Sequence, residues 1–134
     1  MSYLLDTDIC IYWLNGRPSL KDKLLAVGRD QVAISVITQA ELYYGAYNSS
    51  RVQENLKRVD DFLSQIPVIS LHKVILKRFG ALKSQLRQTG QPLPDFDVLI
   101  ASIALTENKV LVTNNTRHYQ RIPDLILENW ASAD

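Results

Sequence analysis

Residues 3–8, Tyr-Leu-Leu-Asp-Thr-Asp, decide the fold and show where to look for chemistry. The first three residues form a short apolar run, which indicates a strand buried in the interior of a sheet. Polar residues follow at once, and the next segment, residues 8–14, has the pattern of a helix. The stretch therefore predicts a buried strand that leads directly into a helix, with Asp6 where the strand ends.

The same alternation of short apolar strands and helices continues along the chain. Further strands are expected at residues 31–35 (QVAIS), 67–71 (PVISL), 110–112 (VLV) and 125–127 (LIL), and helices at 19–27, 37–47, 50–65, 71–89 and 95–108. This order predicts a three-layer α/β domain with a mostly parallel central sheet of four to five strands flanked by helices. Because the chain has 134 residues and shows no repeat or linker, we expect one domain over residues 1–134.

Composition excludes several classes of protein. The formal net charge of +1 gives no strong overall attraction to polyanions, so any contact with RNA must come from a local basic patch. The single cysteine, Cys10, excludes an intramolecular disulfide and a cysteine-based zinc site, and its apolar neighbours indicate a core thiol. No apolar stretch is long enough to span a bilayer and the N-terminus lacks signal-peptide features, so we expect a cytoplasmic protein without membrane contact.

Acidic and amide side chains stand where functional groups are expected in this class of fold. Ligands of parallel α/β sheets bind beyond the carboxyl ends of the strands, and Asp6 and Asn115 each follow a predicted strand. Asp97 lies in the first turn of the helix at 95–108, and Glu41 lies near the start of the helix at 37–47. Both acids belong to apolar segments, where burial of an unpaired carboxylate is costly.

Carboxylates gathered at one edge of a sheet require a cation. Two of them about 4 Å apart repel by roughly 4 kcal/mol at an effective dielectric constant near 20. Hard oxygen ligands favour Mg²⁺ or Mn²⁺ over zinc, and such ions support phosphoryl chemistry. The sequence thus predicts a divalent-cation site with Asp6, Glu41 and Asp97 as its core.

Structural roles are open for several of these acids. Asp8 and Asp95 can be N-caps of their helices, and Asp97 can complement a helix dipole. Residues 38–41, Thr-Gln-Ala-Glu, fit a capping box, which would give Glu41 a purely structural task. For Asp6 the functional interpretation is favoured, because Asp8 is expected to supply the local cap.

Four segments together resemble the PIN-domain ribonucleases of the VapC toxin family: residues 4–14 (LLDTDICIYWL), 35–45 (SVITQAELYYG), 95–105 (DFDVLIASIAL) and 111–130 (LVTNNTRHYQRIPDLILENW). The resemblance covers essentially the whole chain. It implies a Mg²⁺- or Mn²⁺-dependent endoribonuclease that hydrolyses RNA, with tRNA as a reasonable target, and acts as the toxin of a toxin-antitoxin pair. It also implies a homodimer that is inhibited by a VapB-type antitoxin, joins it in a larger assembly and contacts DNA only through it.

The resemblance extends to the site with one departure. Asp6, Glu41 and Asp97 match the three best-defined acids of the family, as metal ligands and catalytic residues. The fourth catalytic position, often Asp, is Asn115 here, and family members with this form commonly place an acid shortly afterwards, where this chain has His118. Since an amide offsets less charge than a carboxylate, we expect one firmly held Mg²⁺ and interpret His118 as a surface loop residue.

Surfaces for partners are less clearly marked. The basic candidates for contacts with RNA phosphates are Arg17, Lys83 and Arg87, which equally fit solvated helix faces. Aromatic residues flank the acidic motifs, and those outside the core are candidates for an antitoxin groove: Tyr12, Trp13, Tyr43, Tyr44 and Tyr47. The alternative function is a catalytically weak PIN-like module that binds RNA or protein, with Asn115 marking a decayed site.

Overall fold

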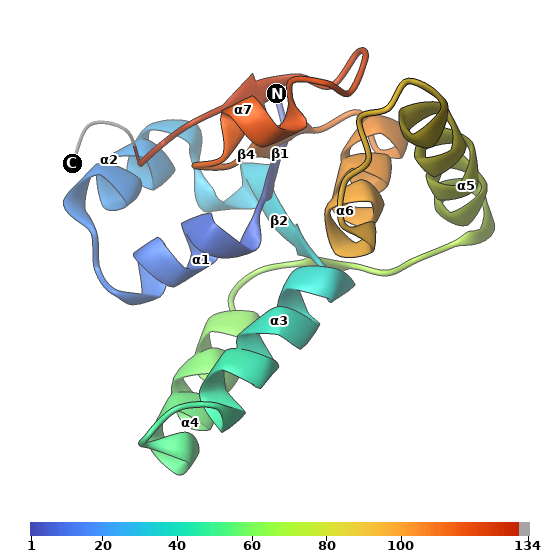
Figure 1. The fold of residues 1–134 in the computed structure, drawn as a ribbon. Helices are drawn as coiled ribbons and strands as arrows, with labels where there is room; N and C mark the ends of the chain where they lie inside the picture. Colours follow the sequence, from blue (N-terminus) through green and yellow to red (C-terminus); the bar gives the residue numbers. More distant parts are fainter. Residues whose placement is uncertain (132–134) are drawn as a thin grey trace.

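The computed structural model describes residues 1–131. Its strands are β1 (Tyr3–Leu5), β2 (Val32–Ser35), β3 (Val68–Ile69), β4 (Val110–Val112) and β5 (Leu127–Glu128). Its helices are α1 (Thr7–Leu14), α2 (Pro18–Val27), α3 (Val36–Tyr47), α4 (Val52–Leu63), α5 (Lys73–Gln88), α6 (Asp95–Thr106) and α7 (Thr116–Tyr119), with a 3₁₀ turn at Arg29–Gln31. The predicted α/β class is confirmed (Figure 1), while residues 132–134 of the predicted domain lie outside the described residues.

The central sheet is parallel and has the strand order β3-β2-β1-β4-β5. The chain builds outward from β1 through β2 to β3, and then returns to place β4 on the other side of β1. The order of the strands therefore reverses between β1 and β4, which creates a crevice beyond their carboxyl ends. The register pairs Leu5 with Val112, so the residues that follow them emerge side by side.

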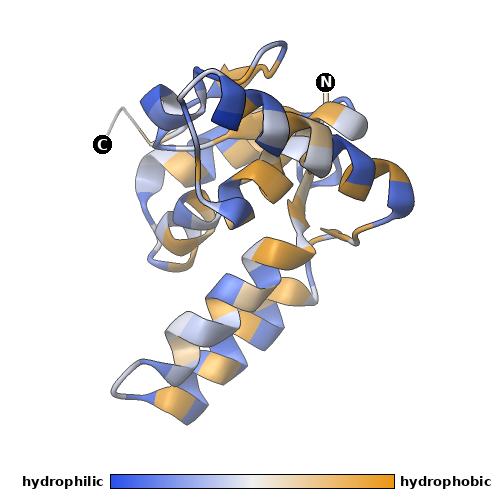
Figure 2. Ribbon diagram, turned by 45° about the vertical axis from the view of Figure 1, so that its right-hand side comes forward, coloured by the Kyte–Doolittle hydropathy of each residue, from blue (hydrophilic) through white to orange (hydrophobic). Residues whose placement is uncertain are grey.

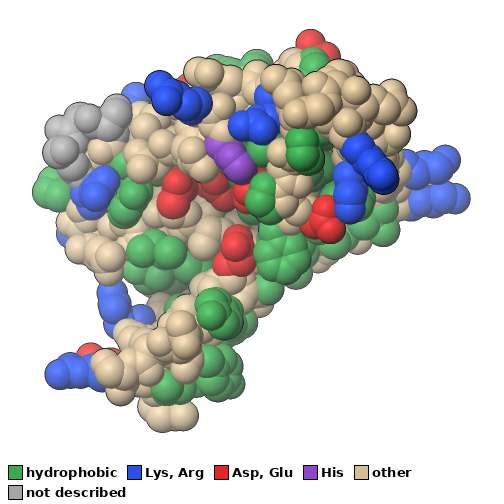
Figure 3. Space-filling model, in the orientation of Figure 1, with side chains coloured by type: hydrophobic (Ala, Val, Ile, Leu, Met, Phe, Trp, Pro, Cys, Tyr) green, Lys and Arg blue, Asp and Glu red, His purple; other side chains and the backbone are tan. Residues whose placement is uncertain are grey.

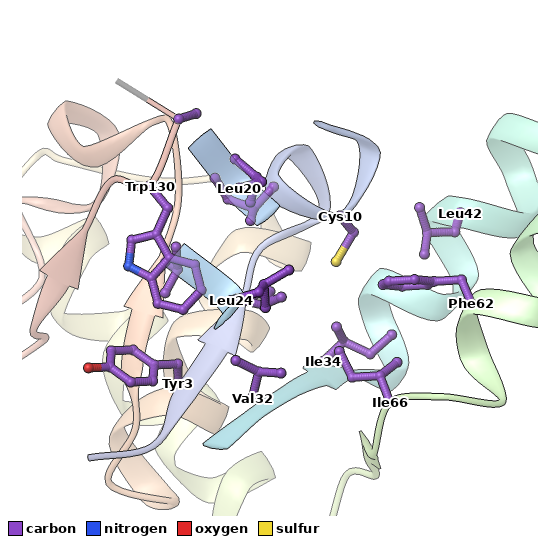
Figure 4. Close-up of a cluster of buried hydrophobic side chains, with 14 of the residues drawn as sticks. Tyr3, Cys10, Leu20, Leu24, Val32, Ile34, Leu42, Phe62, Ile66 and Trp130 are labelled. Carbon is purple, nitrogen blue, oxygen red and sulfur yellow. The ribbon is translucent and has the colours of Figure 1, made fainter. Parts of the chain in front are cut away.

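Helices cover both faces of the sheet. Successive residues of each strand point to opposite sides, so each strand contributes side chains to two cores. Leu5 and Val112 face a core built mainly with α1 to α4, whereas Leu4 and Leu111 face a core built mainly with α5 and α6. Figure 4 shows part of the first core, in which Tyr3, Trp130, Val32 and Ile34 pack with residues from the helices. Cys10 is fully buried there, as predicted for a core thiol, and burial raises its pKa.

Helices α3 and α4 form a hairpin that projects from the body of the molecule (Figure 2). The two helices pack through Leu42, Ala46, Val59 and Phe62, which join the first core. None of the helices within residues 1–131 combines the length and the apolar character that crossing a bilayer would demand.

Three capping roles that the sequence left open are not found in the structure. Asp6, not Asp8, is the N-cap of α1, because its extended backbone directly continues β1 and its carboxylate accepts from the Thr7 amide. Pro94 holds the cap position of α6, so Asp95 is the first helical residue. Ser35 caps α3 by accepting from the Thr38 amide, so residues 38–41 form no capping box.

The C-terminal part also differs from the prediction. Strand β5 lies at Leu127–Glu128 and not at 125–127, because its bounds follow from pairing with Leu111 and Val112 of β4. Helix α7 was not predicted, since its four residues are too few to show an apolar period.

Candidate active site

Asp6 lies at the reversal point of the strand order. Its amide donates to the Val112 carbonyl and so extends the β1–β4 ladder by one residue. One carboxylate oxygen accepts from the Thr7 amide at 2.9 Å, and the other accepts from the Thr113 hydroxyl at 2.9 Å. The side chain is thus fixed in the crevice while the residue remains only 8% exposed.

Asp8 lies beside Asp6, one residue into α1. Its Oδ1 accepts from the Ile9 amide at 2.7 Å, and its Oδ2 accepts from the Asn114 amide at 3.0 Å. The fully buried Thr113 hydroxyl also lies 3.5 Å from this Oδ2. The residues after β4 therefore hold two carboxylates of the β1–α1 junction together.

Asp97 reaches the same edge from α6. This helix precedes β4 and runs back across the sheet, so its first turn returns to the carboxyl ends of the strands. His118 Nε2 lies 2.8 Å from Asp97 Oδ2, and the Tyr119 hydroxyl donates to Asp97 Oδ1 at 3.2 Å. Both partners belong to α7, so this short helix holds the carboxylate in place. His118 lies in α7 and contacts Asp97, so it is not the surface loop residue that was predicted.

Glu41 joins the site through a threonine. Its Oε1 accepts from the Thr7 hydroxyl at 2.6 Å, and that hydroxyl lies 3.0 Å from the Thr38 hydroxyl. Since Ser35 supplies the cap of α3, Glu41 is free of the capping role that competed with a place in the site. The contact with Thr7 points it at the start of α1, next to Asp6.

Asn115 lies at the edge of the site. Its amide donates to the Thr113 hydroxyl at 3.0 Å and its carbonyl accepts from the His118 amide, while its side chain is exposed. The preceding residue, Asn114, binds Asp8 through its amide and the Tyr12 hydroxyl through its side chain. A catalytic role of the Asn115 side chain stays a prediction.

Electrostatics make Asp6, Asp8 and Asp97, the acidic cluster, candidates to hold a cation. Burial, followed by the charges of Asp8 and Asp97, raises the pKa of Asp6 to about 6, against the hydrogen bonds from Thr113 and Thr7. Burial also raises the pKa of Asp8. Burial and mutual repulsion make the ionised form of these carboxylates unfavourable. A hard divalent ion would offset both effects.

The side chains of the acidic cluster are not grouped as a complete set of metal ligands. Among residues 1–131, no three Asp, Glu, His or Cys side chains are already grouped tightly enough to hold one metal ion.

Tyr119 is almost fully buried, and its burial together with the charges of Asp6 and Asp97 raises its pKa, so its hydroxyl stays protonated and remains a donor to Asp97.

Basic side chains surround the acids on the molecular surface. Figure 3 shows acidic side chains gathered on one face next to a histidine, with lysine and arginine side chains spread around them. Of the predicted phosphate contacts, Arg17 stacks over the Tyr12 ring at 3.8 Å, and Lys83 pairs with Asp95 at 2.9 Å. Arg87 is exposed. Basic side chains therefore lie on the same face of the molecule as the acidic ones.

Sequence reasoning missed Asp8, Thr113 and Tyr119 as residues of the site. Asp8 was given the capping role that Asp6 in fact holds. Thr113 follows a buried strand directly, as Asp6 does, and that shared position was the available signal. Nothing local marks Tyr119, because only the packing of α7 against α6 brings its hydroxyl to Asp97.

The capping assignment of α3 is testable by a pair of substitutions. We expect Ser35→Ala to lower the free energy of unfolding by about 1–2 kcal/mol, because the Thr38 amide loses its acceptor in a buried setting. Glu41→Gln should change it by less than about 0.5 kcal/mol, since an amide oxygen can still accept from Thr7. Urea unfolding measures both free energies. A larger loss for Glu41→Gln than for Ser35→Ala would show that Glu41 caps α3.

The family model described as "PIN domain" matches residues 3–125, and the parallel sheet with acids gathered at its carboxyl edge agrees with that match. The chain is 42% identical over 132 residues to "Ribonuclease VapC2" of Rickettsia felis, with 97% of this chain and 98% of the relative covered. It is 31% identical over 131 residues to "tRNA(fMet)-specific endonuclease VapC" of Shigella flexneri, with coverage of 98% and 99%.

A solved structure is similar over the same length. The crystal structure of VapBC2 from Rickettsia felis, bound to a DNA fragment from their promoter, matches with a TM-score of 0.90 at 41% identity and covers 97% of this chain and 99% of that one. The chain therefore belongs to the PIN-domain family and, within it, to the VapC ribonucleases.

Proposed function

We propose that this chain is a metal-dependent endoribonuclease that hydrolyses RNA phosphodiester bonds as the toxin of a toxin-antitoxin pair. The observation that carries the proposal is the convergence of Asp6, Asp8 and Asp97 at the reversal point of the sheet, where burial and repulsion raise the pKa of Asp6 to about 6. The ribonuclease names of its relatives support it.

In this proposal Asp6 and Asp97 hold Mg²⁺ or Mn²⁺, and Glu41 completes the metal shell or orients the attacking water. The ion, when bound, activates water and stabilises charge that develops on the scissile phosphate. The carboxylates provide the hard oxygen donors that these ions favour.

Neighbouring residues of the chain prepare these acids. Thr113 and the Thr7 amide each hold one oxygen of Asp6, and Tyr119 holds Asp97, so the carboxylates need little reorganisation when they act. Asn115 sits where a fourth acid would add charge, and we propose that its amide positions water at the rim.

The substrate we propose is structured RNA, with tRNA as the favoured class. The Shigella flexneri relative is named as specific for tRNA(fMet), and the basic side chains around the acids can hold phosphates on both sides of a cut. Such RNA is cytoplasmic, which is where we propose that the protein acts.

The partner we propose is a VapB-type antitoxin. A groove of about 280 Å³ between α1, α3 and α4 is lined mainly by apolar side chains, including Ile11, Leu14, Leu42 and Val59, and reaches Glu41. An amphipathic helix can bury its apolar face there and obstruct the site. Tyr44 and Tyr47 are 70% and 66% exposed on the same hairpin, whereas Trp13 packs against Phe62 in the core.

The VapBC2 structure from Rickettsia felis holds that complex on a DNA fragment, which supports a complex of this chain with an antitoxin that binds DNA. We propose that two copies of this chain form a homodimer, that antitoxins join them in a larger assembly, and that this assembly contacts DNA through the antitoxin alone.

The function is tested by adding and removing metal. We expect the protein, freed of antitoxin, to cleave RNA with Mg²⁺ or Mn²⁺, to lose activity in EDTA, and to regain it when either ion is added in excess. An Asp97→Asn preparation purified in parallel controls for contaminating nucleases. Cleavage that persists in EDTA would refute the metal-dependent mechanism. RNA binding without cleavage under any of these ions would favour the catalytically weak module.

A further inference from the structure

His118 presents a nitrogen atom to the metal-binding edge. Its Nε2 lies 2.8 Å from Asp97 Oδ2, and the two side chains are 24% and 28% exposed, so both are accessible to a small ion. The Tyr119 hydroxyl binds the other oxygen of Asp97 and leaves Oδ2 as the atom that faces the imidazole.

The separation of these two atoms suits ligands of one ion. In an octahedral site with bonds of about 2.0–2.1 Å, adjacent ligand atoms are about 2.9 Å apart. Nε2 and Oδ2 are already at 2.8 Å. This separation therefore matches the spacing of two adjacent ligands of one ion, and the two side chains would have to turn toward the ion but not to move apart.

We propose that His118 is a nitrogen ligand of the metal site, and that it shifts the preference of this site from Mg²⁺ toward transition-metal ions, including Mn²⁺. The inference rests on the metal-dependent function proposed above. Imidazole is a softer ligand than carboxylate or water, so it favours transition metals over Mg²⁺, which prefers an all-oxygen shell. Asp97 supplies the adjacent oxygen ligand, and Asp6 supplies charge from across the crevice.

The chain contains a matched control. Of its two histidines, His72 also pairs with a carboxylate, since its Nε2 lies 2.9 Å from Glu107 Oε1. Glu107 caps the far end of α6, ten residues after Asp97, which is about 15 Å along a helix. The two histidines therefore share the same kind of contact, but only His118 lies at the acidic cluster.

The test is pulsed electron paramagnetic resonance of the full-length protein loaded with one equivalent of Mn²⁺. We expect modulation from a directly bound imidazole nitrogen, which changes to the ¹⁵N pattern when histidine alone is ¹⁵N-labelled. The signal should vanish in His118→Gln and persist in His72→Gln. The labelled wild-type protein shows whether a histidine nitrogen binds the ion, and a signal that persists in His72→Gln assigns it to His118 even where His118→Gln folds poorly. Circular dichroism checks that both variants fold.

Ion preference gives a second measurement. By titration calorimetry, His118→Gln should bind Mn²⁺ at least about 10-fold more weakly, with a smaller change for Mg²⁺. His118→Glu, which restores an oxygen ligand, should bind Mg²⁺ more tightly than wild type and lower the Mn²⁺-to-Mg²⁺ preference.

The outcomes separate this inference from the proposed function. Bound Mn²⁺ without a histidine nitrogen signal, or with one that survives in His118→Gln, would overturn the role of His118 and leave the metal-dependent function standing. Failure of Mn²⁺ and Mg²⁺ to bind at all would overturn both.

Discussion

Asp6→Asn is expected to lower the rate of RNA cleavage by at least about 1,000-fold, which corresponds to about 4 kcal/mol of lost transition-state stabilisation. Asp6 is the most buried acid of the cluster, and both its oxygens are held by hydrogen bonds at the reversal point of the sheet. Substitution by Asn removes the charge that holds the cation while keeping the volume of the side chain.

The same variant should be more stable than wild type without metal at neutral pH. The pKa of Asp6 is raised from 3.8 to about 6 in the folded protein, so the folded state binds this proton more tightly than the unfolded state does. The protonated Asp6 carboxyl therefore stabilises the folded state. This contribution is fully present below about pH 4 and is lost as pH rises through 6, a difference of up to about 3 kcal/mol. A weakened bond to Thr113 offsets about 1 kcal/mol of the gain.

Urea unfolding in EDTA at pH 4 and pH 7.5, with cleavage assays on the same preparations, measures both effects. Wild type should lose stability between these two pH values, and Asp6→Asn should lose much less. Asp22→Asn, on the exposed surface of α2, should match wild type in both assays. Full cleavage by Asp6→Asn would remove Asp6 from the site, and unfolding of this variant at both pH values would show that its role is structural.

Asp97→Asn has the second largest expected effect, a loss of cleavage of at least about 100-fold. The charge of Asp97 is needed for the cation, and an amide in its place also disturbs the contacts with His118 and Tyr119. Stability should change little, because the carboxylate is partly exposed.

Asp95→Asn is the matched control for this substitution. Both acids lie in the first turn of α6 and complement the helix dipole equally, but Asp95 pairs with Lys83 on the surface. We expect Asp95→Asn to retain cleavage within about 3-fold, in line with the small contribution of exposed ion pairs. Equal losses in the two variants would mean that the acids act through the helix dipole and not through a metal.

The elements of the fold could be predicted because each strand and each long helix carries its own apolar pattern. The strands at residues 110–112 and 31–35 are short apolar runs, and the helix starting at Asp95 is apolar on nearly every side. The chemical type of the candidate site could be predicted as well, since Asp6 ends a strand and Asp97 opens a helix that leads into the next one. Exact caps could not, because Asp6 and Asp8 are equally good capping residues and only the length of β1 distinguishes them.

What the sequence determined by itself is thus the alternation of elements and the positions of Asp6, Glu41 and Asp97 within them, because periodicity and strand ends are local properties. Only the tertiary structure decided which groups meet. The placement of β4 beside β1 brings Thr113 to Asp6 and Asp8, and the packing of α7 against α6 brings His118 to Asp97. Those contacts join residues up to 107 positions apart, and they depend on strand order and helix packing, which no local pattern encodes.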